Sequence, residues 1–90
     1  MTDLEERTRT LKQLKFRSAH RGVAEMDQLL GTFARQALDG LTAAQLAQYQ
    51  ALLDAPDWDA YGWLTGQVAV PEALAEIVAL VVRSAPQTTI

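Results

Sequence analysis

The residue types with the clearest chemical potential lie in one short stretch, Arg21-Gly22-Val23-Ala24-Glu25. Arginine and glutamate offer charge-assisted hydrogen bonds of opposite sign. The glycine between them has no side chain, so the backbone of another protein can approach it closely. We therefore interpret residues 21–25 as a protein-binding corner, with Arg21, Gly22 and Glu25 as its principal residues. The secondary candidates, chosen because they are close in the sequence, are Arg17, His20 and Asp27.

A purely structural interpretation of the corner is open at this point. Gly22 would end one helix, and Glu25 would cap the next helix by reaching back to the N–H of Gly22. Arg21 and Glu25 would then form a surface pair worth at most a few tenths of a kcal/mol. This interpretation explains the glycine and the glutamate, but it explains the basic residues only as charges at the end of a helix.

The sequence contains no recognisable catalytic motif. His20 is the only histidine and there is no cysteine, so a cysteine nucleophile and a thiolate metal site are excluded. No serine–histidine–acid set, G-x-G-x-x-G or P-loop is present. Asp54, Asp57 and Asp59 lack the glycine and closing glutamate of a calcium loop, and we interpret them as helix caps and solvated loop residues. We expect a protein without catalytic residues, metal or cofactor of its own.

Charge is unevenly distributed over the 90 residues. Residues 1–21 carry six basic and three acidic side chains (+3), whereas residues 22–90 carry two basic and eight acidic ones (−6). A basic arm on an acidic body could reach an acidic partner, a phosphate-bearing ligand or nucleic acid, or be no more than a solvated helix face. There is no apolar run of about 18 residues and no leader-like segment, so we expect a protein of the bacterial cytoplasm, rather than of the mitochondrial matrix, without membrane insertion.

Hydrophobic periodicity predicts a compact all-α bundle of five helices with short connections, forming one domain over residues 1–90 with a loose tail from about 86. The expected helices cover about residues 3–21, 23–39, 43–55, 57–65 and 71–84. Thr42 and Gln45 form a predicted capping box, Asp57 a predicted cap, and Pro71 a predicted first helical residue.

Three further features carry specific expectations. Leu4, Leu11, Leu14 and Ser18 share one face of the first helix and are assigned to its core stripe. Gly31 lies inside a helix, which indicates that another helix passes close to it. The aromatic cluster of Trp58, Tyr61 and Trp63 closes the core or, alternatively, includes an exposed ring that anchors an interface.

The segments HRGVAEMDQLLGTFA and LLDAPDWDAYGWLTGQ resemble the SdhE family of succinate dehydrogenase assembly factors, also called FAD assembly or flavinylation factors. The hallmark R-G-x-x-E falls on residues 21–25, and Asp27, the D-x-D at Asp57 and Asp59, and Trp63 add specificity. The resemblance covers roughly residues 11–77. Ala19 is a departure, since relatives often carry a bulkier residue there.

The resemblance implies a five-helix bundle that binds the flavoprotein subunit of succinate dehydrogenase, and in bacteria often that of fumarate reductase. Such a factor promotes covalent attachment of FAD to a histidine of that subunit, while the FAD is bound by the partner and the chemistry is autocatalytic there. The corner at residues 21–25 would face the partner near the flavin. A small helical nucleic-acid-binding protein or an antitoxin-like interaction module is the alternative, although the acidic total charge leads us to expect no nucleic acid partner.

Overall fold

The computed structural model describes residues 3–19, 22 and 24–84, and within them the chain is helical with no strand. The predicted tail from residue 86 and the predicted junction at residues 20, 21 and 23 lie outside the described residues. The five α-helices and two short 3₁₀ helices are α1 (Asp3–Ala19), α2 (Ala24–Ala37), η1 (Leu38–Gly40), α3 (Ala43–Asp54), α4 (Asp57–Leu64), η2 (Glu72–Leu74) and α5 (Ala75–Ser84).

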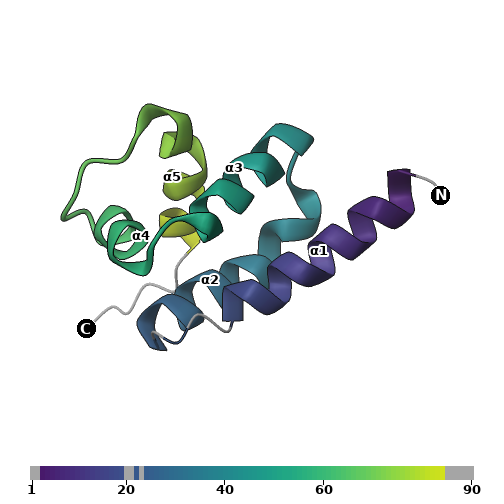
Figure 1. The fold of residues 1–90 in the computed structure, drawn as a ribbon, viewed down its shortest axis with the longest axis horizontal. Coiled ribbons are helices and arrows are strands. Elements are labelled where there is room, and N and C mark those ends of the chain that lie inside the picture. Colours follow the sequence, from purple (N-terminus) through teal and green to yellow (C-terminus); the bar gives the residue numbers. More distant parts are fainter. Residues whose placement is uncertain (1–2, 20–21, 23, 85–90) are drawn as a thin grey trace.

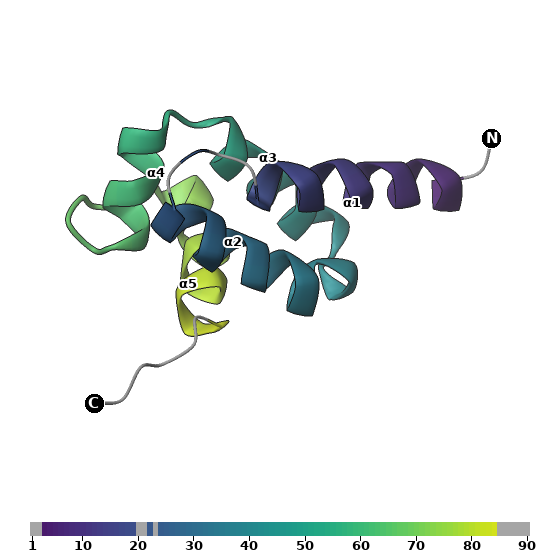
Figure 2. The same ribbon diagram turned by 90° about the horizontal axis from the view of Figure 1, so that it is seen from below.

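The helices pack in two groups, which Figures 1 and 2 show from two sides. Helices α1 and α2 lie side by side in opposite directions and make the most extensive helix–helix contact. Helices α3, α4 and α5 lie together beside α2, with α5 packing against both α2 and α3. The first half of α1 extends beyond the other helices, which accounts for an elongated shape of 45 × 27 × 22 Å. The all-α five-helix architecture expected from the sequence is confirmed.

The predicted capping box of Thr42 and Gln45 is confirmed at the start of α3. The side chain of Thr42 accepts a hydrogen bond from the N–H of Gln45 (3.1 Å), and the side chain of Gln45 accepts one from the N–H of Thr42 (3.0 Å). This reciprocal pair satisfies N–H groups that have no partner inside the helix. Gly66 follows the end of α4 with φ of +80°, a conformation that glycine adopts without strain.

Three boundary predictions are wrong. Asp57 does not cap α4, because Pro56 occupies the cap position without a side-chain hydrogen bond and Asp57 is the first helical residue. Pro71 likewise precedes a 3₁₀ turn, and α5 begins only at Ala75. The predicted helix ending at residue 39 is divided into α2 and η1, since the chain tightens at Leu38 before it turns toward α3.

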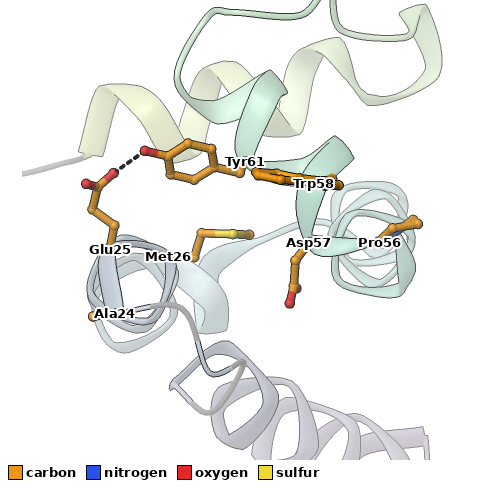
Figure 3. Close-up of a pocket in the computed structure, with 7 residues that line it drawn as sticks. All are labelled: Ala24, Glu25, Met26, Pro56, Asp57, Trp58 and Tyr61. Carbon is orange, nitrogen blue, oxygen red and sulfur yellow. Dashed lines mark hydrogen bonds between the residues drawn. The ribbon is translucent and has the colours of Figure 1, made fainter.

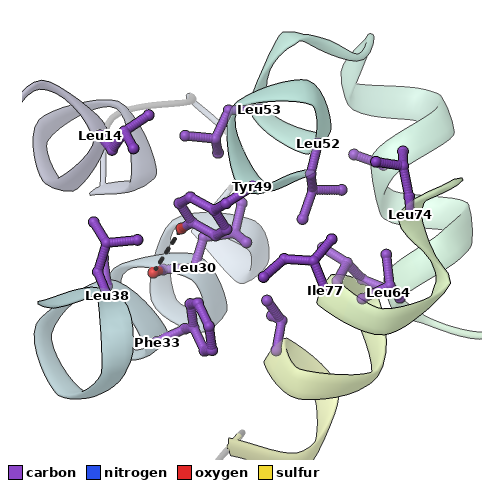
Figure 4. Packing of buried hydrophobic residues seen from close by; sticks show 14 of the residues in the cluster. Leu14, Leu30, Phe33, Leu38, Tyr49, Leu52, Leu53, Leu64, Leu74 and Ile77 are labelled. Atoms are coloured by element: carbon purple, nitrogen blue, oxygen red, sulfur yellow. Dashed lines mark hydrogen bonds between the residues drawn. The ribbon is translucent and has the colours of Figure 1, made fainter. Parts of the chain in front are cut away.

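The core lies where α2, α3 and α5 meet (Figure 4). Leu74 of η2 and Ile77, Val78 and Val81 of α5 are buried in it. The rings of Phe33 and Tyr49 are packed with their centroids 5.4 Å apart. The assignment of Leu4 to the core is wrong: its side chain is 72% exposed, because the first turns of α1 extend past the helices that could cover it.

Ser18 and Tyr49 form a polar contact inside this core. Their hydroxyl oxygens are 2.6 Å apart, and the Ser18 hydroxyl donates to the carbonyl of Leu14 (2.6 Å). The Tyr49 hydroxyl also lies 3.4 Å from the carbonyl of Leu30, the bond drawn in Figure 4. Because buried hydroxyls are costly without partners, this contact fixes the position of α1 against α2 and α3.

Gly31 has the structural role that its place in a helix indicated. It is buried, and a Cβ added there would lie 3.7 Å from the Cβ and 3.8 Å from the Cα of Ala19. Helix α1 therefore passes close to Gly31, at a distance where an added Cβ would make ordinary van der Waals contacts. This contact also gives a physical reason for a small side chain at position 19.

Candidate functional site

The corner at residues 21–25 is open to solvent where the structure describes it. Gly22 is exposed and has φ of +93°, in the region that favours glycine, and no atom lies within 4 Å of the position a Cβ would occupy. The N–H of Gly22 donates to Oδ2 of Asp27 at 3.4 Å. Asp27, a secondary candidate, thus supports the backbone of the corner. Arg21 and His20, the basic candidates beside it, lie outside the described residues.

Glu25 is not the capping residue that the structural interpretation predicted. The N–H of Gly22 is bound by Asp27, and the carboxylate of Glu25 accepts a hydrogen bond of 2.8 Å from the hydroxyl of Tyr61 (Figure 3). The reason is position: Glu25 is the second residue of α2, and its exposed side chain points toward α4 rather than back along the chain. Glu25 therefore joins the start of α2 to α4.

The carboxylate of Glu25 also changes the acidity of Tyr61. The hydrogen bond to Glu25, then the repulsion between the two negative charges, and then partial loss of solvent together raise the pKa of Tyr61 above its usual 10.0. Each of these effects favours the neutral phenol. Tyr61 consequently acts as a donor to Glu25 throughout the physiological pH range.

Arg17 lies in a different contact. Its guanidinium Nη2 is 2.7 Å from Oδ1 of Asp54 at the end of α3, and both side chains are largely exposed. An exposed pair of this kind contributes little to stability, about 0–1 kcal/mol. The structure therefore brings together Gly22, Asp27 and Glu25, whereas it uses Arg17 to connect α1 with α3.

A groove opens beside the corner, between the start of α2 and the start of α4 (Figure 3). Its volume is about 820 Å³, and its lining residues are Ala24, Glu25, Met26, Pro56, Asp57, Trp58 and Tyr61. We call this the α2–α4 groove. Sequence analysis did not find it, because its two walls are some 30 positions apart in the chain; only the aromatic cluster was a signal.

The aromatic cluster of Trp58, Tyr61 and Trp63 contains both an exposed ring and rings that pack against the core. Trp58 is 84% exposed and is the interface-anchor type of residue. Tyr61 and Trp63 are partly buried and pack against the core. The expectation that the cluster as a whole closes the core is thus wrong for Trp58, which lies on the outer side of the first turn of α4.

Three of the basic residues of α1 contact acceptors elsewhere in the protein. Lys15 pairs with Asp39 (2.9 Å), and Arg7 donates to the carbonyls of Asp39 (3.2 Å) and Leu41 (2.8 Å). These contacts hold α1 against the segment that connects α2 and α3, and the Arg17–Asp54 pair joins α1 to the end of α3.

The described residues contain neither a grouping of side chains for a metal ion nor a membrane-spanning helix. Residues 3–19, 22 and 24–84 contain no group of three or more histidine, cysteine, aspartate or glutamate side chains arranged to hold a metal ion. Over the same residues, no helix combines the length and the apolar character needed to cross a lipid bilayer.

Comparison with known proteins adds the family. The chain is 41% identical over 68 residues to "Succinate dehydrogenase assembly factor 2, mitochondrial" of Schizosaccharomyces pombe, covering 76% of this chain and 49% of that protein. It is 49% identical over 53 residues to the protein of the same name from Meyerozyma guilliermondii, covering 59% of this chain and 39% of that protein. It is 39% identical over 61 residues to "FAD assembly factor SdhE" of Acetobacter pasteurianus, covering 68% of this chain and 56% of that protein.

The matched region covers most of this chain but only part of the length of each relative. The chain spans about half or less of the length of the first two of these proteins. The model of the family described as "Flavinator of succinate dehydrogenase" matches residues 12–85, which include the corner, the α2–α4 groove and the core helices. This chain therefore belongs to the succinate dehydrogenase flavinator family.

Proposed function

We propose that this protein is an assembly factor that binds the flavoprotein subunit of succinate dehydrogenase and promotes covalent attachment of FAD to it. The family description and the names of its relatives, which refer to succinate dehydrogenase and to FAD assembly, support this role. The FAD is held by the partner, and the bond to the flavin forms there without a catalytic group from this chain. The flavoprotein of fumarate reductase is a second client in this proposal.

The observation that carries the proposal is the open corner. Gly22 is exposed, has a conformation suited to glycine and has no atom above its Cα, so a partner backbone can lie directly against it. The carboxylate of Glu25 is exposed beside it and is held in place by Tyr61. The fixed carboxylate of Glu25 can accept hydrogen bonds from a partner's N–H or O–H groups, while the main chain of that partner lies against the exposed backbone of Gly22.

The physical basis of the activity is selective binding. A factor of this kind favours attachment when it binds the attachment-competent conformer of the flavoprotein more tightly than the other conformers. Its effect on the rate is bounded by that difference in affinity. It therefore needs a specific binding surface and no acid, base or nucleophile.

A reconstitution tests the proposal. Apo flavoprotein subunit and FAD are incubated with and without this protein, and covalent flavin is measured by in-gel fluorescence after denaturation. We expect faster or fuller attachment with the wild-type chain, and about tenfold weaker client binding with Glu25→Ala. Glu6→Ala, which removes an exposed carboxylate from the first half of α1, at the other end of that helix from the corner, is the matched control and should behave as the wild type.

Two results would count against the proposal. One is the absence of both complex formation and stimulation with the wild-type chain. The other is equal activity of Glu25→Ala and Glu6→Ala, which would remove the corner from the mechanism. The same assay with the fumarate reductase flavoprotein tests the second client.

The nucleic-acid alternative makes a different prediction. It requires binding that weakens steeply with salt, because phosphate contacts release counterions. The engagement of Arg7, Lys15 and Arg17 with acceptors inside the protein argues against it. Salt-sensitive binding to DNA or RNA, without binding to the flavoprotein, would favour it.

A further inference from the structure

The α2–α4 groove has an aromatic wall that nothing in the described chain covers. Trp58 is 84% exposed, the largest exposed fraction among the large hydrophobic residues described. Met26, by contrast, is 1% exposed and lies between the two helices, pointing toward Tyr61 and Trp58 in Figure 3. A buried apolar side chain such as Met26 beside a largely exposed indole such as that of Trp58 is typical of a site where a partner buries a side chain.

The groove is acidic as well as apolar. Two of its seven lining residues are carboxylates, Glu25 and Asp57, and none of the seven is basic. The hydrogen bond from Tyr61 uses only Oε2 of Glu25. Lys15 and Arg17, on the neighbouring helix α1, have their charges paired with Asp39 and Asp54 outside the groove.

These features together specify the chemistry of an occupant. A cation complements the carboxylates, and an indole face attracts a cation through its ring quadrupole. Arginine satisfies both requirements better than lysine, because its planar guanidinium stacks on an aromatic ring while its N–H groups bind a carboxylate. An apolar neighbour in the same segment would cover Met26.

We propose that the α2–α4 groove binds a protein segment that carries an arginine next to an apolar side chain. The guanidinium lies over the indole of Trp58 and donates to Glu25, and the apolar side chain enters between α2 and α4. The identity of the segment rests on the proposed function, since we assign it to the flavoprotein client. The groove is then a second contact zone beside the corner, with Trp58 as its anchor.

A peptide titration tests the chemistry of the groove without the client. Three blocked peptides that differ at one position, Ala-Leu-Arg-Leu-Ala with Arg, Gln or Glu at the centre, are added to the labelled full chain. Millimolar affinity is expected for a ligand of this size. We expect the arginine peptide to shift the NMR signals of the Trp58 indole, Tyr61 and the Met26 methyl, and the other two to bind at least several-fold more weakly.

Client binding provides the second arm, with Trp58→Ala against Leu4→Ala. Both residues are largely exposed apolar side chains, and Leu4 lies at the far end of α1. Trp58→Ala should weaken binding of the apo flavoprotein at least about tenfold, Trp58→Phe less, and Leu4→Ala by less than about twofold. Circular dichroism should give the same helical content for all of them, because neither side chain supports the core.

The outcomes separate this inference from the proposed function. Equal client affinity of Trp58→Ala and wild type would overturn the inference and leave the assembly role standing. Failure of the wild type to bind the flavoprotein would overturn the assembly role, and the peptide titration would then decide the groove by itself. Absent shifts in the groove, or shifts of equal size with all three peptides, would overturn the inference whatever the client does.

Discussion

The hydroxyl of Tyr61 on α4 donates a hydrogen bond of 2.8 Å to the carboxylate of Glu25 on α2, across 36 positions of the sequence. This bond connects the corner at residues 21–25 with the α2–α4 groove. It gives Glu25 a fixed position without burying its charge. A partner therefore meets a carboxylate whose orientation is already set, which lowers the entropy lost on binding.

This relationship predicts a pH dependence at Tyr61. Because Glu25 raises the pKa of Tyr61 above 10.0, the folded protein holds the phenolic proton more tightly than the unfolded chain does. The resulting contribution to stability is fully present below about pH 10 and is lost as the pH rises through the folded-state pKa. Titration of the ¹³Cζ signal of Tyr61 measures this pKa directly.

The pH dependence of Tyr61 is tested with the variant Glu25→Gln, and Asp59→Asn is its control. Glu25→Gln should lower the pKa of Tyr61 toward its usual value, because the charge is lost and the hydrogen bond is weakened. Asp59→Asn removes a nearby charge of α4 that does not bind Tyr61, and should leave the titration in place. An unchanged midpoint in Glu25→Gln would show that the bond is not formed in solution.

The corner predicts different effects on client binding for two glycines that both have positive φ. Gly22 and Gly66 have φ of +93° and +80°, and neither has an atom within 4 Å of a would-be Cβ. Arginine at either position should cost about 1–2 kcal/mol of unfolding free energy through strain, with helical content retained. Only Gly22→Arg should abolish client binding, by about a hundredfold or more, because its side chain blocks the corner.

Gly66→Arg is therefore the control for strain. Binding by calorimetry and unfolding by urea, measured on both variants, separate the two effects. If both variants bind equally well, the corner does not contact the client. If Gly22→Arg unfolds and Gly66→Arg does not, Gly22 has a structural role in the fold beyond its local conformation.

The buried contact between Ser18 and Tyr49 predicts a cost in stability without a cost in binding. Ser18→Ala removes the hydroxyl that lies 2.6 Å from the hydroxyl of Tyr49, and should lower the unfolding free energy by about 1–3 kcal/mol. Thr8→Ala removes an exposed hydroxyl that bonds the carbonyl four residues earlier in the same helix, and should cost less than about 0.5 kcal/mol. Equal effects in urea unfolding would contradict a role for the buried contact.

Two glycines inside helices predict opposite signs for the same substitution. At Gly31 an added Cβ makes ordinary contacts with Ala19 and with the flexible end of Arg35, so Gly31→Ala should stabilise by about 0.5–1 kcal/mol. At Gly62 the Cβ would lie 2.6 Å from Cγ2 of Val68, so Gly62→Ala should destabilise by about 1–3 kcal/mol. Thermal unfolding of the two variants would contradict this account if their midpoints moved in the same direction.

The sequence by itself determined the features that depend on neighbours in the chain. The capping box at Thr42 and the buried face of η2 and α5 follow from local hydrogen bonding and helix periodicity, which act within about one or two turns. Its resemblance to the flavinator family also rests on short segments, and the match over residues 12–85 confirms it.

The sequence determined the ends of helices less well where two local signals compete for the same position. Asp57 is a good cap by type, yet Pro56 takes the cap position, because proline favours the extended conformation that a cap requires. Leu4 has the spacing of a core residue, yet periodicity gives only the face of a helix and not its depth in the fold. Whether a neighbouring helix covers that face depends on packing.

Only the tertiary structure decided what Glu25 and Trp58 do. From the sequence, Glu25 was interpreted as a protein-binding residue of the corner or, structurally, as a cap and a partner for Arg21. In the fold its carboxylate accepts a hydrogen bond from the hydroxyl of Tyr61, while the carboxylate of Asp27 accepts one from the N–H of Gly22. Trp58 belonged to an aromatic cluster whose exposure no local pattern fixes. The packing of α4 beside the start of α2 places these residues around one groove, and contacts between residues more than 30 positions apart are set by burial of the whole core rather than by spacing in the chain.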